Sequence, residues 1–231
     1  MAREAKKDGG KKVYHVYVFR HGQTYFNKDK IFTGWKESKL TPLGIKQAKV
    51  IARKLKDKEI DVAFQTKLSR SKDTLKEVLK YHPECREIIT ANDMIERNYG
   101  DLNGVSHEDF IKRIGRQELD LLKHGDAIEN LSKQDRKRIG KFLGEEEYNL
   151  IHRGYDIPPT NGESFKMIEK RVGRFIKALE KFVKKEKVNV AISAHGNSIR
   201  LFRKIMEKAP VSETVKWIIP YTKIFVYKIK V

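Results

Sequence analysis

His21 and His195 are the residues of this sequence with the clearest chemical potential. Each stands directly after a segment predicted to be a buried strand, and each is followed by a glycine. Arg20 precedes His21, and Arg70 opens a predicted helix after another strand. If these side chains share a pocket, their imidazole and guanidinium groups can bind a phosphate dianion together with main-chain N–H groups at helix starts. The sequence therefore predicts a phosphate site.

A neutral imidazole in such a site can attack phosphorus directly, which splits phosphoryl transfer into two displacements through a phosphorylated enzyme. The cationic donors neutralise charge on the phosphoryl oxygens, so the reaction needs no metal. We therefore expect a phosphohistidine at His21. Glu96 is a candidate acid for the leaving alcohol, because nearby phosphate oxygens favour the protonated form of its carboxyl group. From the residues alone, surface pairing of Glu96 with Arg97 is an equally good interpretation.

Metal binding is another interpretation of His21, His195 and Glu96. These three residues lack the short spacing that is typical of metal ligands, and the neighbouring arginines Arg20 and Arg70 would repel a cation. We therefore expect no metal.

Five segments have the β-branched and aromatic composition of buried strands. They lie at residues 13–19, 60–65, 87–90, 188–193 and 221–229. Predicted helices separate them, which indicates an α/β fold with three layers (α/β/α) and a mostly parallel central sheet. Parallel strands bring their carboxyl ends to one edge of the sheet, where ligands bind. His21 and His195 should therefore meet at that edge.

Helix signals are clear at several places. Thr41 and Pro42 provide an N-cap and a proline in the first turn. The apolar stripe expected to follow consists of Ile45, Ala48, Ile51, Ala52 and Leu55. A long amphipathic helix is predicted from Phe165 to Val183, and a further helix follows His195.

Two segments differ from this pattern. Residues 1–12 are polar and rich in lysine, which predicts a disordered basic tail before a single domain over residues 13–231. Residues 106–155 are charged and only weakly periodic. We expect them to form a helical insertion over the site.

The composition limits the partners. The chain carries 50 Lys and Arg residues against 31 Asp and Glu residues, a formal net charge of +19 at pH 7, which attracts anionic ligands. Zinc-finger spacing, RNA-stacking aromatic signatures and basic heptads are missing from the sequence, so we expect no nucleic-acid partner. No apolar run has the length of a membrane span and the first residues do not resemble a signal peptide, which predicts a cytoplasmic protein without a membrane partner. The single cysteine, Cys85, cannot form an internal disulfide.

Four motifs resemble those of the cofactor-dependent phosphoglycerate mutases in the histidine phosphatase superfamily. They are RHGQT at residues 20–24 with Asn27, FTGW at 32–35, ERNYGDLNG at 96–104 and AHGNSIR at 194–200. The resemblance covers about residues 13–110 and resumes from about residue 150. It implies a phosphorylated His21, a phosphoryl group bound by Arg20, Arg70 and His195, and Glu96 as proton donor and acceptor.

The resemblance also implies a pocket for a small anionic phosphate ester, with 2,3-bisphosphoglycerate as the phosphorylating cofactor and no metal. The expected pocket residues are Asn27, Thr33, Gly34, Arg97, Tyr99, His107, His152, Arg153, Gly196 and Asn197. His152 and Arg153 would contact the distal phosphate or carboxylate. For Trp35 we expect ordinary packing. A homo-oligomer is left open.

Two activities fit this resemblance, and exclusion of water decides between them. The FTGW and AHGNS motifs favour a phosphoglycerate mutase that interconverts 3-phosphoglycerate and 2-phosphoglycerate. His107 stands where the mutases usually carry lysine, and His152 where they usually carry the first of two arginines. Gly162-Glu163-Ser164 is more typical of the phosphatases, and the chain ends directly after its last predicted strand, without the mutase tail.

We expect the mutase, with a metal-independent phosphatase of small phosphate esters as the alternative. A silent superfamily member that only binds a phosphorylated partner is a third interpretation. The joint presence of His21, Arg20, Arg70, Glu96 and His195 argues against it, because a silent relative is free to lose any of them.

Overall fold

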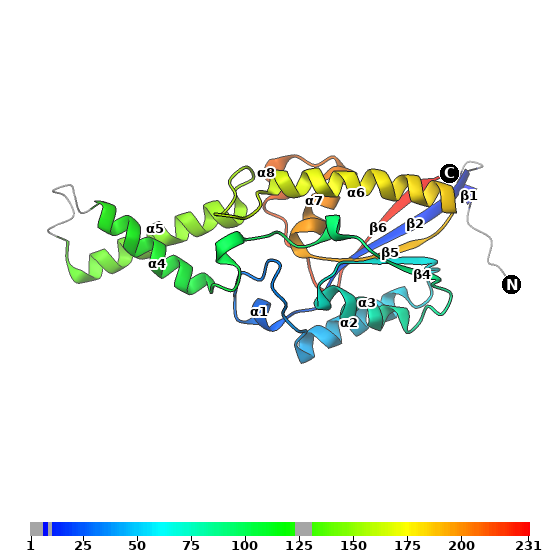
Figure 1. Ribbon diagram of the computed structural model, residues 1–231, viewed down its shortest axis with the longest axis horizontal. Helices are drawn as coiled ribbons and strands as arrows, with labels where there is room; N and C mark the ends of the chain where they lie inside the picture. Colours follow the sequence, from blue (N-terminus) through cyan, green and yellow to red (C-terminus); the bar gives the residue numbers. More distant parts are fainter. Residues whose placement is uncertain (1–6, 9–10, 123–130) are drawn as a thin grey trace.

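The computed structural model describes residues 7–8, 11–122 and 131–231, in which a mainly parallel β-sheet is covered by helices on both faces (Figure 1). The strands are β1 (Lys7–Asp8), β2 (Lys11–Arg20), β3 (Val62–Gln65), β4 (Glu87–Thr90), β5 (Val190–Ala194) and β6 (Ile224–Lys230). Strands β2, β5, β3 and β4 are neighbours in this order and run parallel. β6 pairs antiparallel with the other edge of β2, and β1 pairs antiparallel with the first residues of β2.

The described residues also form eight α-helices. They are α1 (Tyr25–Lys28), α2 (Pro42–Leu55), α3 (Ser69–Leu79), α4 (His107–Leu122), α5 (Lys133–Arg153), α6 (Phe165–Glu186), α7 (Gly196–Glu207) and α8 (Val211–Thr214), with short 3₁₀ helices at Asn92–Met94 and Gly100–Leu102. Helices α6 and α7 cover one face of the sheet, and α2 and α3 cover the other (Figure 1). The predicted three-layer α/β/α fold is confirmed. None of the helices in the described residues has the length and apolar character of a membrane span.

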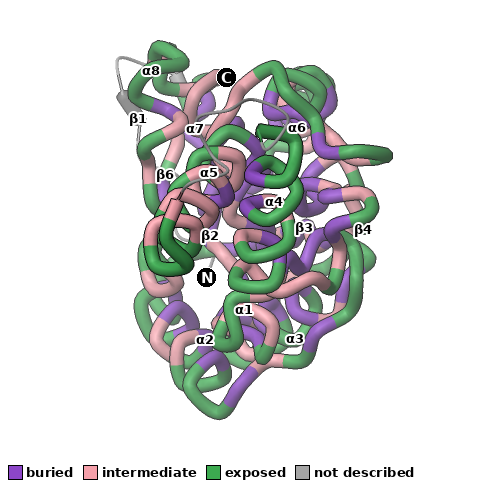
Figure 2. The backbone as a smooth tube through the Cα atoms, turned by 90° about the vertical axis from the view of Figure 1, so that its left-hand side faces the viewer, coloured by how far each residue is buried: buried purple, intermediate pink, exposed green. Residues whose placement is uncertain are grey.

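Alternation along β2 divides the core between the two faces. Val16 and Val18 pack in the cluster with α6 and α7, whereas Tyr17 and Phe19 pack in the cluster with α2 and α3. Successive side chains of a strand point to opposite faces, so a strand covered on both sides must be apolar at nearly every position. This explains why the segment that predicted the strand is apolar along nearly its whole length. Figure 2 colours the buried residues purple.

Two local expectations need correction. β2 begins at Lys11 and is preceded by β1, so part of the segment expected to be a tail is paired, while residues 1–6 and 9–10 lie outside the described residues. Ile45 was expected in the buried stripe of α2, but its side chain is 41% exposed. In the first turn of α2 it is Gly44 that lies against the main chain of Gln23, and Ile45 is turned away from that contact by about 100°.

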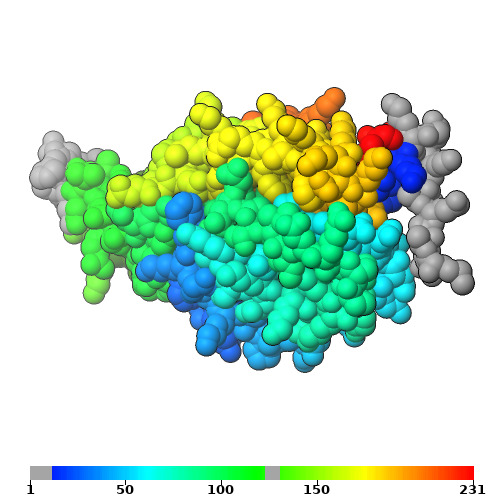
Figure 3. Space-filling model, turned by 45° about the vertical axis from the view of Figure 1, so that its right-hand side comes forward, coloured from blue at the N-terminus to red at the C-terminus, as the bar shows by residue number. Residues whose placement is uncertain are grey.

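Helices α4 and α5 form an antiparallel pair that extends from the body of the molecule (Figures 1 and 3). Glycines allow the close contact between them. A Cβ at Gly115 would lie 1.8 Å from the main-chain oxygen of Gly140, and one at Gly144 would lie 2.0 Å from that of Ile111. Residues 106–155 therefore contain the two helices, and only the base of the pair lies near the strand ends. Residues 123–130 lie outside the described part of the chain.

Candidate active site

His21 and His195 lie side by side at the carboxyl edge of the sheet. The parallel register of β2 and β5 places Arg20 opposite Ala194, and the N–H of His21 donates to the main-chain oxygen of Ala194 at 3.0 Å. The two imidazole centroids are 5.0 Å apart with an interplanar angle of 60°. Both side chains are buried. The expectation that the two histidines meet is therefore met.

The ring of His21 is oriented for attack. Its Nδ1 lies 2.7 Å from the main-chain oxygen of Gly22. A carbonyl oxygen can only accept a hydrogen bond, so Nδ1 carries the proton and Nε2 keeps its lone pair. Burial lowers the pKa of His21 well below its usual value, and the charges of Arg70 and Arg20 lower it further. The ring is neutral at physiological pH, as a nucleophile must be.

Buried polar atoms surround His21. Nε2 of His195 lies 2.8 Å from the hydroxyl of Thr66, and burial together with Arg70 and His21 lowers the pKa of His195 well below its usual value. Within the described residues, Nδ1 of His195 and the Nε atoms of Arg20 and Arg70 are buried without a hydrogen-bond partner. Buried polar atoms without partners are costly, and the two guanidinium Nε atoms can only donate, so their concentration here matches a site that binds the oxygens of an anion.

Main-chain oxygens fix the two guanidinium groups. Arg20 donates to Ile219 at 3.0 Å, and Arg70 donates to Gly34 at 2.7 Å and to Lys36 at 2.9 Å. Burial lowers the pKa of Arg70 to about 10, which leaves it charged at neutral pH. The cations that face His21 are thus held in place before a ligand binds, and this preorganisation strengthens the electrostatic stabilisation of a bound anion.

Glu96 is held both by its carboxyl group and by its main chain. Oε1 accepts hydrogen bonds from the N–H of Arg97 at 2.9 Å and the N–H of Asn197 at 3.1 Å. The carbonyl oxygen of Glu96 accepts from Nε1 of Trp35 at 2.8 Å and from Arg171 at 3.1 Å. Because Oε1 already accepts two hydrogen bonds, Oε2 is the oxygen suited to proton transfer.

Two interpretations of Arg97 from the sequence are wrong. Its side chain is fully buried and donates to the main-chain oxygens of Glu163 at 2.6 Å, Ile151 at 2.8 Å and Ile157 at 3.3 Å. It therefore neither pairs with Glu96 at the surface nor lines the pocket. Through these hydrogen bonds, the Arg97 guanidinium connects the loop after Glu96 to the end of α5 and to the segment that follows α5.

Packing is not the main contact of Trp35 either. Its side chain is 41% exposed, and its indole N–H binds the carbonyl oxygen of Glu96. Trp35 follows Gly34, whose positive φ of 49° and close approach to Asn103 require a residue without a side chain. The FTGW segment therefore positions the acid candidate through its main chain.

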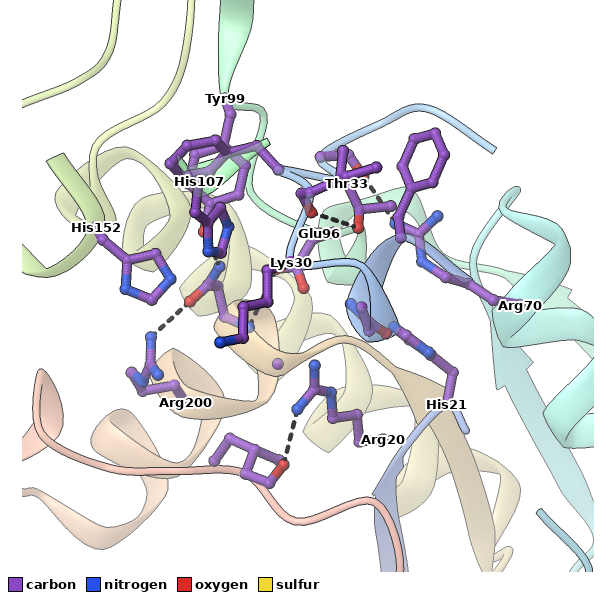
Figure 4. Close-up of a pocket in the computed structure, with 18 of the residues that line it drawn as sticks. Arg20, His21, Lys30, Thr33, Arg70, Glu96, Tyr99, His107, His152 and Arg200 are labelled. Atoms are coloured by element: carbon purple, nitrogen blue, oxygen red, sulfur yellow. Dashed lines mark hydrogen bonds between the residues drawn. The ribbon is translucent and has the colours of Figure 1, made fainter. Parts of the chain in front are cut away.

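The other predicted residues lie in the same pocket, which has a cavity volume of about 260 Å³ (Figure 4). Beside the groups already described, it is lined by Asn27, Thr33, Gly34, Tyr99, His107, His152, Arg153, Gly196 and Asn197. Of the residues predicted from the sequence for the site, Arg97 and His195 do not line it. His195 is fully buried beside His21, between the pocket and the sheet edge. Tyr99 also accepts a hydrogen bond of 3.2 Å at its hydroxyl from the side-chain amide of Asn197.

Histidines from the insertion form an uncharged part of the wall. His107 begins α4, and its Nδ1 lies 3.1 Å from the hydroxyl of Tyr148, whose ring stacks on His152. Burial lowers the pKa of His107 to about 4 and that of His152 to about 3, and the charges of Lys30 and Arg153 respectively lower them further. Both histidines are neutral at pH 7, so they cannot attract an anion by charge.

Several lining residues were missed from the sequence. They are Phe26, Lys30, Ile31, Phe32, Arg200, Ile218, Ile219 and Tyr221. Arg200 stands in the AHGNSIR motif, three residues after Asn197, and this spacing puts both side chains on the same face of a helix. In the structure, the guanidinium of Arg200 donates a hydrogen bond of 2.5 Å to Oδ1 of Asn197. Tyr221, which lies 4.2 Å from the guanidinium of Arg20, had no comparable signal because only the return of the last strand brings it close.

Three side chains of the site lie close enough together to contact one metal ion. Donor atoms of His21, Glu96 and His195 lie within 4.8 Å of one another. Arg20 and Arg70 are the charged neighbours of both rings, and their charges already lower the pKa values of the histidines. A cation would meet the same repulsion, so an anionic ligand suits this donor set better.

Comparisons with known proteins agree with this chemistry. The family model described as "Histidine phosphatase superfamily (branch 1)" matches residues 16–143 and 127–230. A 2,3-bisphosphoglycerate-dependent phosphoglycerate mutase from Parvibaculum lavamentivorans is 33% identical over 80% of this chain and 76% of its own length.

Solved structures share the fold. Alpha-ribazole phosphatase from Shigella flexneri matches with a TM-score of 0.68 and 22% identity, over 92% of this chain and 89% of that chain. Phosphoglycerate mutase from Bacillus anthracis matches with a TM-score of 0.67 and 21% identity, over 96% of this chain and 92% of that chain. Proteins named for hydrolysis and for isomerisation thus have similar folds, so the fold does not choose between the two activities.

Proposed function

Since the chain belongs to branch 1 of the histidine phosphatase superfamily, we propose that it is a phosphoglycerate mutase that interconverts 3-phosphoglycerate and 2-phosphoglycerate through a phosphohistidine at His21. The superfamily acts on phosphate esters. The relatives named as 2,3-bisphosphoglycerate-dependent mutases support the finer assignment. The observation that carries it is the distribution of charge in the pocket.

Five cationic side chains and one carboxylate line the pocket. The cations are Arg20, Lys30, Arg70, Arg153 and Arg200. Arg20 and Arg70 lie beside the nucleophile and suffice for one phosphoryl group. The other three come from α5, α7 and the loop after α1, and face no carboxylate other than Glu96 within the pocket lining. A substrate with a second anionic group, as in a phosphoglycerate, matches this excess of positive charge.

The mechanism follows from the fixed groups. Nε2 of His21 attacks phosphorus, and the donors of Arg20, Arg70 and His195 neutralise the phosphoryl oxygens. Oε2 of Glu96 gives its proton to the departing ester oxygen as the bond from phosphorus to that oxygen breaks. On the primed enzyme, Glu96 takes a proton from the free hydroxyl of the bound 3-phosphoglycerate, and that hydroxyl oxygen attacks the phosphohistidine. Nε2 of His21 then takes the phosphoryl group from the other ester oxygen, to which Glu96 returns the proton. His21 is phosphorylated again at the end of the cycle, and 2-phosphoglycerate is released.

The residues also fit the proposed cofactor, because the buried donors near His21 and the distal cations can hold two anionic ends. Arg20 and Arg70 would hold one end of 2,3-bisphosphoglycerate, and Lys30, Arg153 and Arg200 the other. When bound, it supplies the phosphoryl group that primes His21.

A phosphatase of small phosphate esters is the second candidate. It is favoured by the neutral state of His107 and His152, which weakens the hold on a distal anion. A weakly held product leaves before the phosphoryl group can return to it, and water then takes its place.

The test uses the purified protein with 3-phosphoglycerate and a catalytic amount of 2,3-bisphosphoglycerate. We expect 2-phosphoglycerate to form faster than inorganic phosphate. Release of phosphate without 2-phosphoglycerate would refute the mutase in favour of hydrolysis. Acid-labile phosphate should appear on the wild-type protein and on the control His15→Gln, but not on His21→Ala; a wild-type protein without it would indicate a silent binder.

A further inference from the structure

Lys30 is bound through its main chain to the start of the helical insertion. It follows α1 with a positive φ of 53°, and its carbonyl oxygen accepts the N–H of His107 at 2.9 Å. The next residue, Ile31, forms a bridge with Ser106. This backbone arrangement directs the side chain into the pocket, where Figure 4 shows it pointing toward the space between Arg20 and Arg200.

The ammonium of Lys30 differs from the other cations of the pocket because it is not engaged. Arg153 donates to the main-chain oxygen of Val215 at 3.0 Å. Arg200 donates to the oxygen of Trp217 at 2.8 Å and 3.2 Å. For Nζ of Lys30, the residues that the structure describes offer neither a hydrogen bond nor an ion pair. Its side chain is exposed at the mouth of the pocket, so it can move to meet a ligand.

The histidines that line the pocket beside Lys30 carry no charge. His107, bonded to it through the main chain, is neutral at pH 7, and so is His152. A lysine at position 107 would bring a positive charge to this part of the pocket. Lys30, whose main chain is hydrogen-bonded to His107, supplies that charge instead. A lysine is suited to this role because its point charge sits on four flexible methylene groups.

We propose that Lys30 is the mobile specificity-determining cation of the pocket, and that it closes on the second anionic group of the substrate in place of a charge at His107. The inference rests on the proposed function in that it requires a ligand with two anionic ends. It limits the substrates to phosphate esters that carry a carboxylate or a second phosphate. An ordinary solvated surface lysine would have no effect on this choice.

Isothermal titration tests this without turnover when every protein also carries His21→Ala. In that background, the dissociation constants of 3-phosphoglycerate and of inorganic phosphate are measured for the otherwise wild-type chain, Lys30→Met and the control Lys28→Met. Lys28 ends α1, is exposed and does not line the pocket. Loss of one charge-assisted contact should weaken 3-phosphoglycerate about tenfold in K30M, with a change of about twofold or less for phosphate. The ratio should be unchanged in K28M.

A rescue variant separates charge from fold. Adding His107→Lys to Lys30→Met should restore most of the preference for 3-phosphoglycerate. An unchanged ratio in K30M, an equal loss for both ligands, or a wild type that binds 3-phosphoglycerate no more tightly than phosphate would each overturn the proposal. A protein that discriminates through Lys30 but releases phosphate on turnover would keep this inference and refute only the mutase.

Discussion

The main-chain N–H of Asn197 donates a hydrogen bond of 3.1 Å to Oε1 of Glu96, across a sequence separation of 101 residues. The contact ties the first turn of α7, directly after His195, to the loop that carries the acid candidate. It places a carboxyl oxygen within 4.8 Å of the donor atoms of both histidines. The acid candidate and the proposed nucleophile are therefore brought together by the fold before substrate binds.

Glu96→Gln should separate the two uses of this carboxyl group. The amide oxygen can still accept from Arg97 and Asn197, so the melting temperature should change little. Proton donation is lost, and kcat with 3-phosphoglycerate should fall by about 10² to 10⁴. Phosphorylation of His21 by p-nitrophenyl phosphate, whose leaving group needs no proton, should fall much less. An equal loss with both donors would argue against Glu96 as the acid.

Trp35→Phe should show that the indole N–H positions Glu96. Loss of the 2.8 Å bond to the Glu96 carbonyl removes about 1 kcal/mol of hydrogen bonding, so we expect kcat to fall about fivefold with little change in KM. The control is the same change in the Glu96→Gln background. There it should cost almost nothing further, because there is no acid left to position; full additivity would mean that Trp35 acts elsewhere.

The stability of the protein should fall in acid because four histidines are held neutral. They are His21, His107, His152 and His195, and burial is the first cause of each lowered pKa. The unfolded chain takes up protons below about pH 6.5 while the folded protein does not, so the free energy of unfolding decreases as the pH falls. Each fully buried histidine should cost about 1 kcal/mol per pH unit below about pH 6, and the half-buried His107 and His152 less.

Urea unfolding at pH 7.5, 6.5 and 5.5 measures this slope. His107→Gln should make it shallower, because the contribution of His107 extends from about pH 6.5 down to its folded pKa of about 4. A free energy of unfolding that does not change between pH 6.5 and 5.5 would contradict the neutral state of these rings.

Metal removal should not affect turnover. Although His21, Glu96 and His195 could approach a common ion, Arg20 and Arg70 supply the positive charge that phosphoryl transfer needs. We expect the initial rate to be the same before and after dialysis against EDTA. Activity that is lost on dialysis and returns with a divalent cation would refute the metal-independent mechanism.

The fold could be predicted well from the sequence because its signals are local. The apolar run that became β2 and the N-cap at Thr41, whose side chain accepts from Gly44, depend on neighbouring residues. The meeting of His21 and His195 required one further rule, that parallel strands end at the same edge of a sheet. Ile45 shows the limit of local periodicity, since its exposure depends on what lies opposite the first turn of α2.

By itself, the sequence determined the family motifs, the parallel strands whose carboxyl ends carry the two histidines, and the residue types for attack and phosphate binding. Only the tertiary structure decided how individual side chains are used. Arg97 is buried against main-chain oxygens, Trp35 holds Glu96, and Lys30 enters the pocket without a partner among the described residues. These roles depend on which distant segment lies against each side chain, and that follows from packing of the whole chain rather than from spacing within a motif.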